Sequence, residues 1–125
     1  MNLISFERIT GHEVTQQPVG GMVSVQVLCD CNGEGALFYA TDKDLDSALR
    51  KLRDLVYRHH TMIVFERQKW CCCDCGRRRG LDPDHIQLRS HSRLDTVQNL
   101  KGRCRECHDI RHGKRVRPAD GKAAR

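Results

Sequence analysis

Two C-x2-C pairs constrain this chain more than any other feature of its sequence. Cys72 and Cys75 form the first pair, Cys104 and Cys107 form the second, and residues 76–103 lie between them. Four thiolates presented by two such knuckles can complete a tetrahedral zinc site. The separation exceeds that of short zinc fingers, so we expect the intervening segment to hold secondary structure of its own.

The composition supports a metal-stabilised fold whose C-terminal half is strongly basic. Of the 125 residues, 5% are aromatic and 30% are charged, so apolar burial alone would stabilise the C-terminal half poorly. Residues 1–66 carry 6 Lys and Arg against 9 Asp and Glu, whereas residues 67–125 carry 16 against 7. The net charges are therefore −3 and +9, and the positive half is typical of a surface that binds nucleic acid.

The sequence predicts a cytoplasmic protein with no membrane contact. No apolar run approaches the roughly 20 residues of a membrane span, and the first residues lack the layout of a signal peptide. In a reducing compartment the eight cysteines are better interpreted as metal ligands than as disulfides, although disulfides remain an alternative. A second zinc site made by Cys29, Cys31, Cys71 and Cys73 is a further alternative to buried or loop thiols without a metal.

Residues 1–66 are predicted to form a small β-β-α-β layer that positions the rest of the chain or binds a protein partner. Alternating Val and polar residues predict strands over 22–28 and 36–40, which a turn would join into a hairpin. A weaker alternation predicts a short strand over 5–10. Residues 11–21 contain Gly and Pro and are expected to form a loop.

A helix follows this hairpin in the predicted layer. Thr41 or Asp42 would cap it, and an apolar stripe at helical spacing would continue to about His59. His59 and His60 would then lie at the helix C-terminus, where the helix dipole favours positive charge. The β-branched residues 61–66 predict a final strand that leads into the first cysteine pair.

A zinc-clamped β-β-α unit is predicted for residues 67–113. Residues 81–88 are expected to form a strand, Asn99 lies on a second short strand or loop, and a helix is expected over about 103–113. Residues 114–125 are rich in Lys, Arg, Gly, Pro and Ala, and are predicted to be a disordered basic tail. The chain thus belongs to the α+β class.

Acidic and imidazole side chains between and after the cysteines suggest a second, catalytic metal. His108 and His112 are four residues apart on the predicted helix and share a face, whereas Cys107 is rotated by about 100° and can face a separate zinc. Asp84 offers a hard oxygen ligand beside His85, whose imidazole can accept a proton near neutral pH. This combination suits metal-assisted hydrolysis of a phosphodiester.

The stretch from the first cysteine pair to His112 is similar to the HNH endonuclease family. That family has a ββα-metal core, which often carries two C-x2-C zinc pairs. Asp84 and His85 match its first motif position, Asn99 follows 14 residues later, and His108 follows another 9 residues on. The sequence Leu-Asp-Pro-Asp-His also resembles the recombination endonuclease VII type, but the gap to Asn99 and the His after the last cysteine favour HNH.

The resemblance implies a role for each matching residue. His85 would be the general base, and Asp84 and His108 would bind the catalytic metal. His112 matches a further ligand that only some members have. Asn99 would hydrogen-bond the backbone and hold the loop that positions His85, and the two cysteine pairs would bind a structural zinc. The resemblance does not extend to residues 1–66.

The resulting hypothesis is a metal-dependent HNH endonuclease that hydrolyses DNA, with structural Zn²⁺ and a catalytic Mg²⁺, Mn²⁺ or other divalent cation. DNA would be bound mainly through its phosphates. The candidate phosphate-binding residues are all basic: Arg77, Arg78, Arg79, Arg93, Lys114 and Arg115. The alternative is a zinc-stabilised module that binds nucleic acid or protein without catalysis. No role is assigned to His12.

Overall fold

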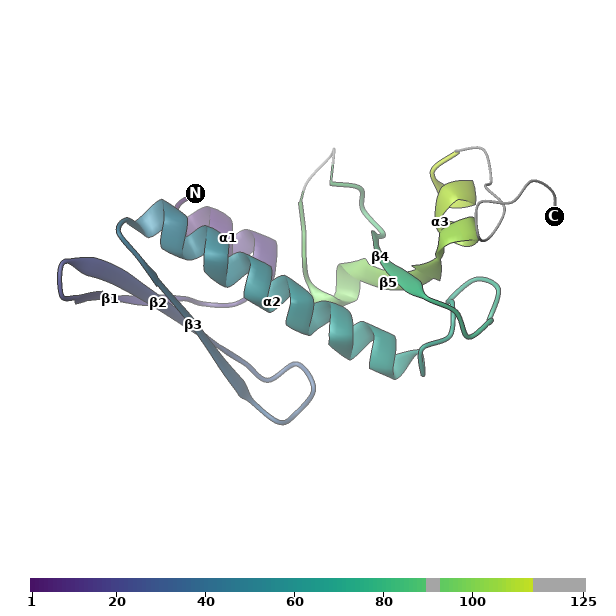
Figure 1. Ribbon diagram of the computed structural model, residues 1–125, viewed down its shortest axis with the longest axis horizontal. Helices are drawn as coiled ribbons and strands as arrows, with labels where there is room; N and C mark the ends of the chain where they lie inside the picture. The colour runs from purple at the N-terminus through teal and green to yellow at the C-terminus, as the bar shows by residue number, and fades with distance from the viewer. Residues whose placement is uncertain (90–92, 114–125) are drawn as a thin grey trace.

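The computed structural model describes residues 1–89 and 93–113 and shows a mixed α/β protein with two small sheets along one long helix (Figure 1). Its elements are α1 (Leu3–Thr10), β1 (Thr15–Val19), β2 (Met22–Cys29), β3 (Ala36–Asp42), α2 (Leu45–Arg67), β4 (Leu81–His85), the 3-10 helix η1 (Val97–Asn99), β5 (Leu100–Cys104) and α3 (Arg105–Arg111). The prediction of helices with small sheets is confirmed at this level, and the structure contains groups of Cys, His and Asp that could hold a metal ion. The predicted basic tail, with Lys114 and Arg115, lies outside the described residues.

The helix α2 is the element that both halves of the chain share. The three-stranded sheet crosses its first half, and β4, β5 and α3 lie beside its second half (Figure 1). One hydrophobic cluster joins the first half to α1 and the sheet: Phe6, Val25, Val27, Ala40, Ala48, Leu49, Leu52 and Val56. Another joins the second half to η1 and β5: Ile63, Val64, Phe65, Val97 and Leu100. Two small cores therefore depend on one helix.

The prediction of a strand over residues 61–66 is wrong, because these residues continue α2 to Arg67. The β-branched residues there favour a strand locally. However, Val56, His60, Ile63 and Val64 are buried at helical spacing, and the packing of that face outweighs the weak intrinsic preference. The N-terminal half consequently has no final strand, and the predicted β-β-α-β order is corrected.

The prediction for residues 5–10 is also wrong, because they lie in α1. The side chain of Asn2 caps this helix by accepting a hydrogen bond from the Ser5 amide at 2.8 Å. Phe6, Ile9 and Thr10 are buried at helical spacing on one side. Because the helix is short, burial of its apolar face stabilises it more than the intrinsic helix propensity of its residues does.

The first sheet has the order β1-β2-β3 with antiparallel pairing throughout. The strands predicted over 22–28 and 36–40 are confirmed as β2 and β3. All five residues of β1 are exposed, so no apolar alternation marks it within the loop that the sequence predicted for residues 11–21. Because β3 extends to Asp42, the cap of α2 is Asp44 rather than Thr41 or Asp42.

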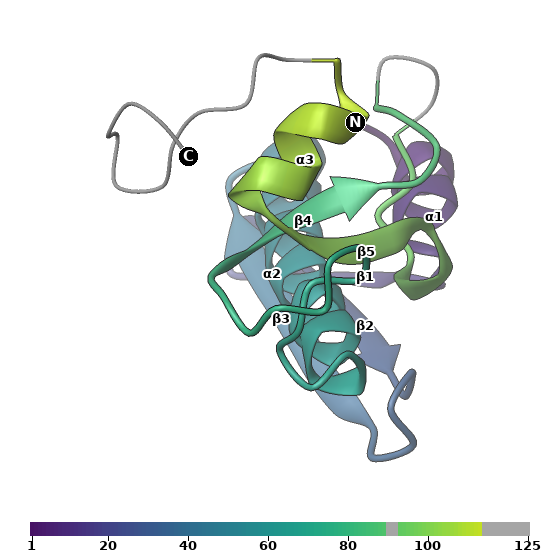
Figure 2. The same ribbon diagram turned by 90° about the vertical axis from the view of Figure 1, so that its right-hand side faces the viewer.

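The second sheet consists of β4 and β5, and α3 follows β5 directly. The strands are antiparallel, with Asp84 opposite Lys101 and His85 opposite Leu100. Figure 2 shows α3 lying over this strand pair. The predicted order of two strands and a helix is therefore present, although β4 ends at His85 rather than at residue 88. In the described part of the chain, no helix has the length and apolar composition to cross a membrane.

The end of α2 is joined to β5 through Gly102. The Gln68 side chain donates to the Gly102 carbonyl at 2.9 Å and accepts from its amide at 2.8 Å, as a neighbouring strand would. A Cβ at position 102 would lie 2.8 Å from Phe65 Cδ1. Phe65 is buried, so its ring has little room to move.

Gly102→Ala should destabilise the protein by about 1–3 kcal/mol, because the added methyl overpacks the contact with Phe65. Denaturant unfolding would measure this loss. Gly80→Ala is the matched control, since a Cβ there meets nothing within 4 Å. Adding Phe65→Leu should recover part of the loss, and strictly additive effects of the two changes would contradict the proposed clash.

Candidate functional site

The four cysteines of the C-x2-C pairs converge at the far end of α2. The ligand atoms of Cys72, Cys75, Cys104 and Cys107 all lie within 4.8 Å of one another, and Cys75 Sγ is 3.8 Å from Cys104 Sγ. Zinc–sulfur bonds of about 2.3 Å in a tetrahedron place sulfurs about 3.8 Å apart, so the group fits a zinc ion. The chain turns at Gly76, whose φ of 75° is the left-handed conformation expected after the first pair.

The backbone of the first knuckle favours a thiolate at Cys72. The Asp74 amide donates to Cys72 Sγ at 3.4 Å. Burial raises the pKa of the Cys72 thiol, but hydrogen bonds from the backbone of Cys104, Cys75 and Asp74 outweigh burial and lower the pKa to about 6. Burial and the neighbouring sulfurs raise the pKa of Cys107. A cation at this point would stabilise several thiolates together.

A second group combines Asp84 from β4 with two histidines of α3 and its C-terminus. Asp84 Oδ1 is 2.9 Å from His112 Nε2 and 3.8 Å from His108 Nε2. The two imidazole rings have centroids 4.5 Å apart. The ligand atoms of all three residues lie within 4.8 Å of one another, so this group can hold a divalent cation.

Two arginines hold the other oxygen of Asp84. Arg103 Nη1 lies 2.6 Å from Asp84 Oδ2, and Arg111 Nε lies 2.9 Å from it. Burial raises the pKa of Asp84, but the hydrogen bond from His112 and the charge of Arg103 lower it more, and the pKa lies below its usual value. The carboxylate is thus ionised, with Oδ1 directed toward the histidines and Oδ2 neutralised.

His85 lies beside this group and is oriented by a buried carboxylate. Its side chain is 8% exposed, and its Nε2 is 2.8 Å from Oδ1 of the fully buried Asp95. Burial raises the pKa of Asp95, but hydrogen bonds from His85 and Arg93 lower it more, so Asp95 is ionised and only accepts. His85 Nε2 therefore carries a proton, so in a neutral imidazole the lone pair that a general base needs is on Nδ1.

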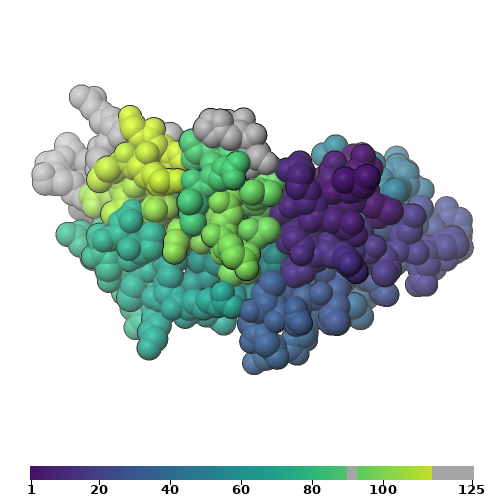
Figure 3. Space-filling view, turned by 180° about the vertical axis from the view of Figure 1, so that it is seen from behind, coloured from purple at the N-terminus to yellow at the C-terminus, as the bar shows by residue number. Residues whose placement is uncertain are grey.

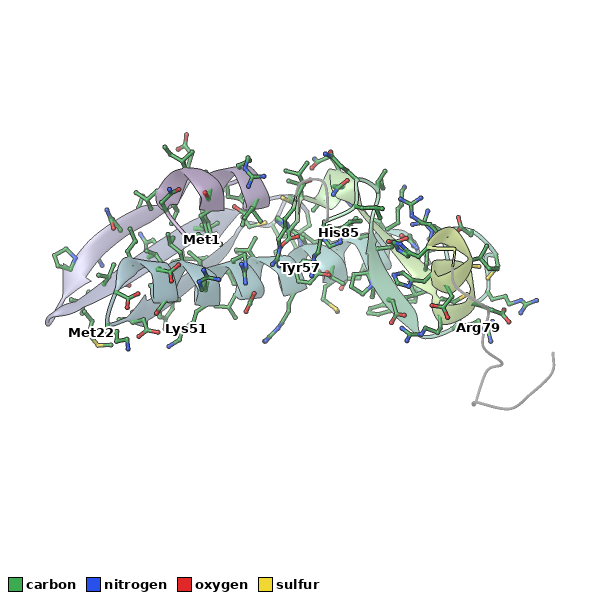
Figure 4. The ribbon with its side chains drawn as sticks, turned by 90° about the horizontal axis from the view of Figure 1, so that it is seen from above. Met1, Met22, Lys51, Tyr57, Arg79 and His85 are labelled. Atoms are coloured by element: carbon green, nitrogen blue, oxygen red, sulfur yellow. The ribbon has the colours of Figure 1, made fainter. Side chains whose placement is uncertain are left out.

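Tyr57 of α2 forms one wall of the space around His85. The two rings are stacked, with centroids 5.9 Å apart, and Figure 4 shows them side by side near the middle of the molecule. A pocket of about 290 Å³ opens here. Its lining includes Tyr57, Asp84, His85, Arg89, His108 and His112. The proposed base and the metal-binding group therefore face one space.

Asn99 makes the backbone contacts that the sequence led us to expect. Its side chain accepts from the Gln87 amide at 2.8 Å and donates to the Leu94 carbonyl at 2.8 Å. The Ile86 amide also donates to the Asn99 carbonyl at 2.8 Å. Asn99 consequently joins the residues after β4 to the segment that carries Asp95.

The predicted phosphate-binding arginines differ in how free they are. Arg77 and Arg79 lie 4.0 and 3.3 Å from Glu106, and Arg93 is bound to Asp95 at 2.9 Å. Arg78 is exposed and pairs with Cys71 through an isolated β-bridge. Figure 4 places Arg79 at the α3 end of the molecule, away from His85. Sequence reasoning therefore chose several arginines that serve ion pairs within the protein.

Sequence reasoning missed four residues that line the pocket or hold its side chains: Asp95, Arg89, Arg103 and Arg111. Arg89 is exposed, lines the pocket and lies 5.3 Å from the centre of the Tyr57 ring. No local sequence pattern marks Asp95. It reaches His85 because the segment around it folds back against α1, where the Asp95 amide bonds the Ile9 carbonyl. Arg103 and Arg111 flank the second cysteine pair, and this position is the only signal that could have suggested them.

The remaining cysteines separate into two environments. Cys71 and Cys73 belong to no metal-binding group within the described residues, and Cys73 is exposed. Cys29 and Cys31 instead lie with His12 and His60. The alternative zinc site built from Cys29, Cys31, Cys71 and Cys73 is therefore wrong. His59 and His60 are also not at a helix end, because α2 continues past them to Arg67.

Comparison of the chain with models of protein families, with curated proteins and with solved structures gives no match.

Cys104→Ser should cost one bound zinc and unfold the C-terminal half, because zinc binding at four thiolates is coupled to folding. Amide NMR signals of β4, β5 and α3 should lose their dispersion, whereas signals of β2 and β3, which belong to the other core, should keep theirs. Cys73→Ser is the matched control and should retain both zinc and dispersion. A Cys104→Ser protein that has lost this zinc but keeps a folded C-terminal half would refute the structural role.

Proposed function

We propose that this protein is a metal-dependent endonuclease of HNH type that hydrolyses phosphodiester bonds in DNA. The observation that carries the proposal is the joint placement of His85 and the group of Asp84, His108 and His112 around one pocket. The resemblance of the sequence to the HNH family and the order β4-β5-α3 are consistent with it. Fold and sequence pattern alone would not establish an activity, so the chemistry of the site has to support it.

His85 is suited to remove a proton from water. Asp95 holds Nε2–H, which fixes the ring and leaves Nδ1 basic. When Nδ1 takes the proton, the imidazolium that forms is stabilised by the ionised carboxylate 2.8 Å from Nε2. Stacking on Tyr57 restricts rotation of the ring. Together these contacts provide a preorganised general base.

Asp84, His108 and His112 would hold the catalytic cation. Their single carboxylate oxygen and two imidazoles suit Mn²⁺, Zn²⁺ or Ni²⁺, and Mg²⁺ is compatible if water completes its coordination. When bound, such a cation neutralises charge on the phosphate and on the leaving oxygen. The arginines on Asp84 Oδ2 keep the other oxygen aligned for this purpose.

Binding to DNA would rest mainly on the phosphate backbone. The sequence from residue 67 onward has a net charge of +9, and the exposed Arg89 stands at the pocket. Charges of this kind attract phosphates without regard to base sequence, so affinity should fall steeply with salt. The two cysteine pairs would bind Zn²⁺ as a structural ion, and this ion would take no part in the reaction.

One observation favours the second candidate, a zinc-stabilised binding module without catalysis. Asp84 already makes close ion pairs with Arg103 and Arg111, so the carboxylate has a structural use that does not require a metal. A module of this kind would bind nucleic acid or protein through its basic half. Cleavage assays separate the two candidates.

His85→Gln should lower plasmid nicking in Mg²⁺ or Mn²⁺ by about 10²- to 10⁴-fold, because glutamine can still donate to Asp95 but cannot accept the proton. Initial cleavage rates would be measured beside DNA affinity and thermal stability, both of which should change little. Absence of nicking by the wild-type protein with any divalent cation would favour the binding module. Wild-type rates in the variant would exclude His85 as the base.

Asp95→Asn should also abolish most cleavage, for a different reason. Arg93 would bind the amide oxygen, so the amide NH2 would face His85 Nε2 and move the imidazole proton to Nδ1. The ring would then present no lone pair, and we expect kcat to fall about 10²-fold or more with KM for DNA nearly constant. Asp42→Asn, which changes a carboxylate of β3 that pairs with Lys51, is the control. An unchanged kcat would refute the orienting role of Asp95.

A further inference from the structure

A second cluster of sulfur and nitrogen atoms lies within the N-terminal half, away from both groups described above. It combines His12, which follows α1, with Cys29 at the end of β2, Cys31 in the next loop, and His60 in the middle of α2. The two Nε2 atoms are 2.8 Å apart. Cys29 Sγ is 3.6 Å from His60 Nε2, and Cys31 Sγ is 3.6 Å from His12 Nε2 and 3.8 Å from His60 Nε2.

These distances resemble those within a tetrahedral zinc site. Zinc–nitrogen bonds of about 2.0–2.1 Å and zinc–sulfur bonds of about 2.3 Å imply nitrogen–sulfur separations of about 3.5–3.6 Å. The separations of 3.6, 3.6 and 3.8 Å agree with this value. The two nitrogens stand closer than the roughly 3.3 Å that zinc would impose. A cation would therefore only need to move the rings apart by about 0.5 Å.

The remaining nitrogen of His60 already has the partner that a metal-binding histidine needs. Its Nδ1 lies 2.7 Å from the backbone carbonyl of Asp95, and a carbonyl only accepts, so Nδ1 carries the proton. The lone pair of Nε2 is then directed toward the sulfurs and His12. Contacts of this kind fix the tautomer and ring orientation of zinc ligands.

Burial and access are both compatible with a bound ion. Cys29 and His60 are fully buried and rigidly placed, whereas His12 and Cys31 are only half-buried and would admit the ion from solvent. Two thiols with two neutral imidazoles form a donor set that suits Zn²⁺ and discriminates against Mg²⁺.

We propose that His12, Cys29, Cys31 and His60 bind a second structural zinc ion, separate from the ion held by the two C-x2-C pairs. The proposal does not depend on nuclease activity. Three segments that are distant in the sequence would be joined at one point, in a half of the chain whose core contains few large side chains. The ion would stabilise this half of the chain, as a zinc ion at the four cysteines would stabilise β4, β5 and α3.

The same site would also fix the segment that carries Asp95. His60 Nδ1 holds the Asp95 carbonyl, and the Asp95 amide donates to the Ile9 carbonyl at 2.8 Å. In Figure 3 the N-terminal helix lies directly against the part of the chain around residue 95 to 100. Asp95 would therefore connect the zinc ligand His60 to His85, through its carbonyl on one side and its carboxylate on the other.

Metal analysis of the purified full chain tests the proposal. After saturation with Zn²⁺ and removal of excess metal, the wild-type protein should hold one zinc ion more per chain than Cys31→Ala or His12→Ala and as many as Cys73→Ser, as measured by mass spectrometry of zinc content. The difference is diagnostic because the four-cysteine site and the Asp84 group are the same in all of these chains. Equal zinc contents in the wild type and both variants would overturn the proposal.

Two further readouts cover the case in which a variant does not fold. With Co²⁺ in place of zinc, the difference between wild type and Cys31→Ala should show the d–d bands of a site with two sulfurs and two nitrogens, at higher energy than those of a four-sulfur site. In the wild type, alkylation of Cys31 should be slow with Zn²⁺ and increase at least about tenfold after chelation. Equal alkylation of Cys31 with and without Zn²⁺ would overturn the proposal without any substitution.

Discussion

The continuity of α2 is the constraint on which the rest of the structure depends. This helix of 23 residues packs with α1 and the first sheet through its first half and with β5 and η1 through its second half. If it ended near His59, the two halves would share no core. Because it continues, Tyr57, His60 and Phe65 lie on one helix. Each of them contacts a different part of the C-terminal half of the chain. The geometry around His85 is thereby linked to the packing of the N-terminal layer.

Buried charge is tolerated in this small protein because each buried carboxylate has several partners. Asp95 accepts from His85 and Arg93, and Asp84 is surrounded by two arginines and two histidines. An isolated carboxylate in such a setting would take up a proton, whereas a well-paired one stays ionised. The proposed chemistry uses this property, since an ionised Asp84 can bind a cation and an ionised Asp95 can orient a base. The same pairs also contribute to specifying the fold, so site and scaffold are not separable here.

Metal coordination at the proposed sites would complement a hydrophobic core that is divided into two small clusters. Two groups of four ligands accompany these clusters. One is made of the four cysteines beyond the end of α2, and the other surrounds His60 and includes Cys31, which packs against the second cluster. Coordination bonds supply stability where apolar area is limited, and they also fix the position of loops that carry no apolar residues. The contact between α2 and β5 is also close, and Gly102 lies there because the space beside Phe65 is too small for a side chain.

Features whose signals lie within a few residues or at motif spacing could be predicted from the sequence alone. The C-x2-C pairs predicted the two knuckles, and the alternation of apolar and polar residues predicted β2 and β3. The steps of 14 and 9 residues from His85 to Asn99 and His108 predicted a candidate site that the structure brings together. Only the tertiary structure decided that residues 61–66 are helical, that Asp95 meets His85, and that His12 and His60 join Cys29 and Cys31. In each of these cases the deciding contacts join residues that the chain separates widely or lie on a face whose burial no local pattern reveals. Long-range packing therefore outweighed local propensity where the two disagreed.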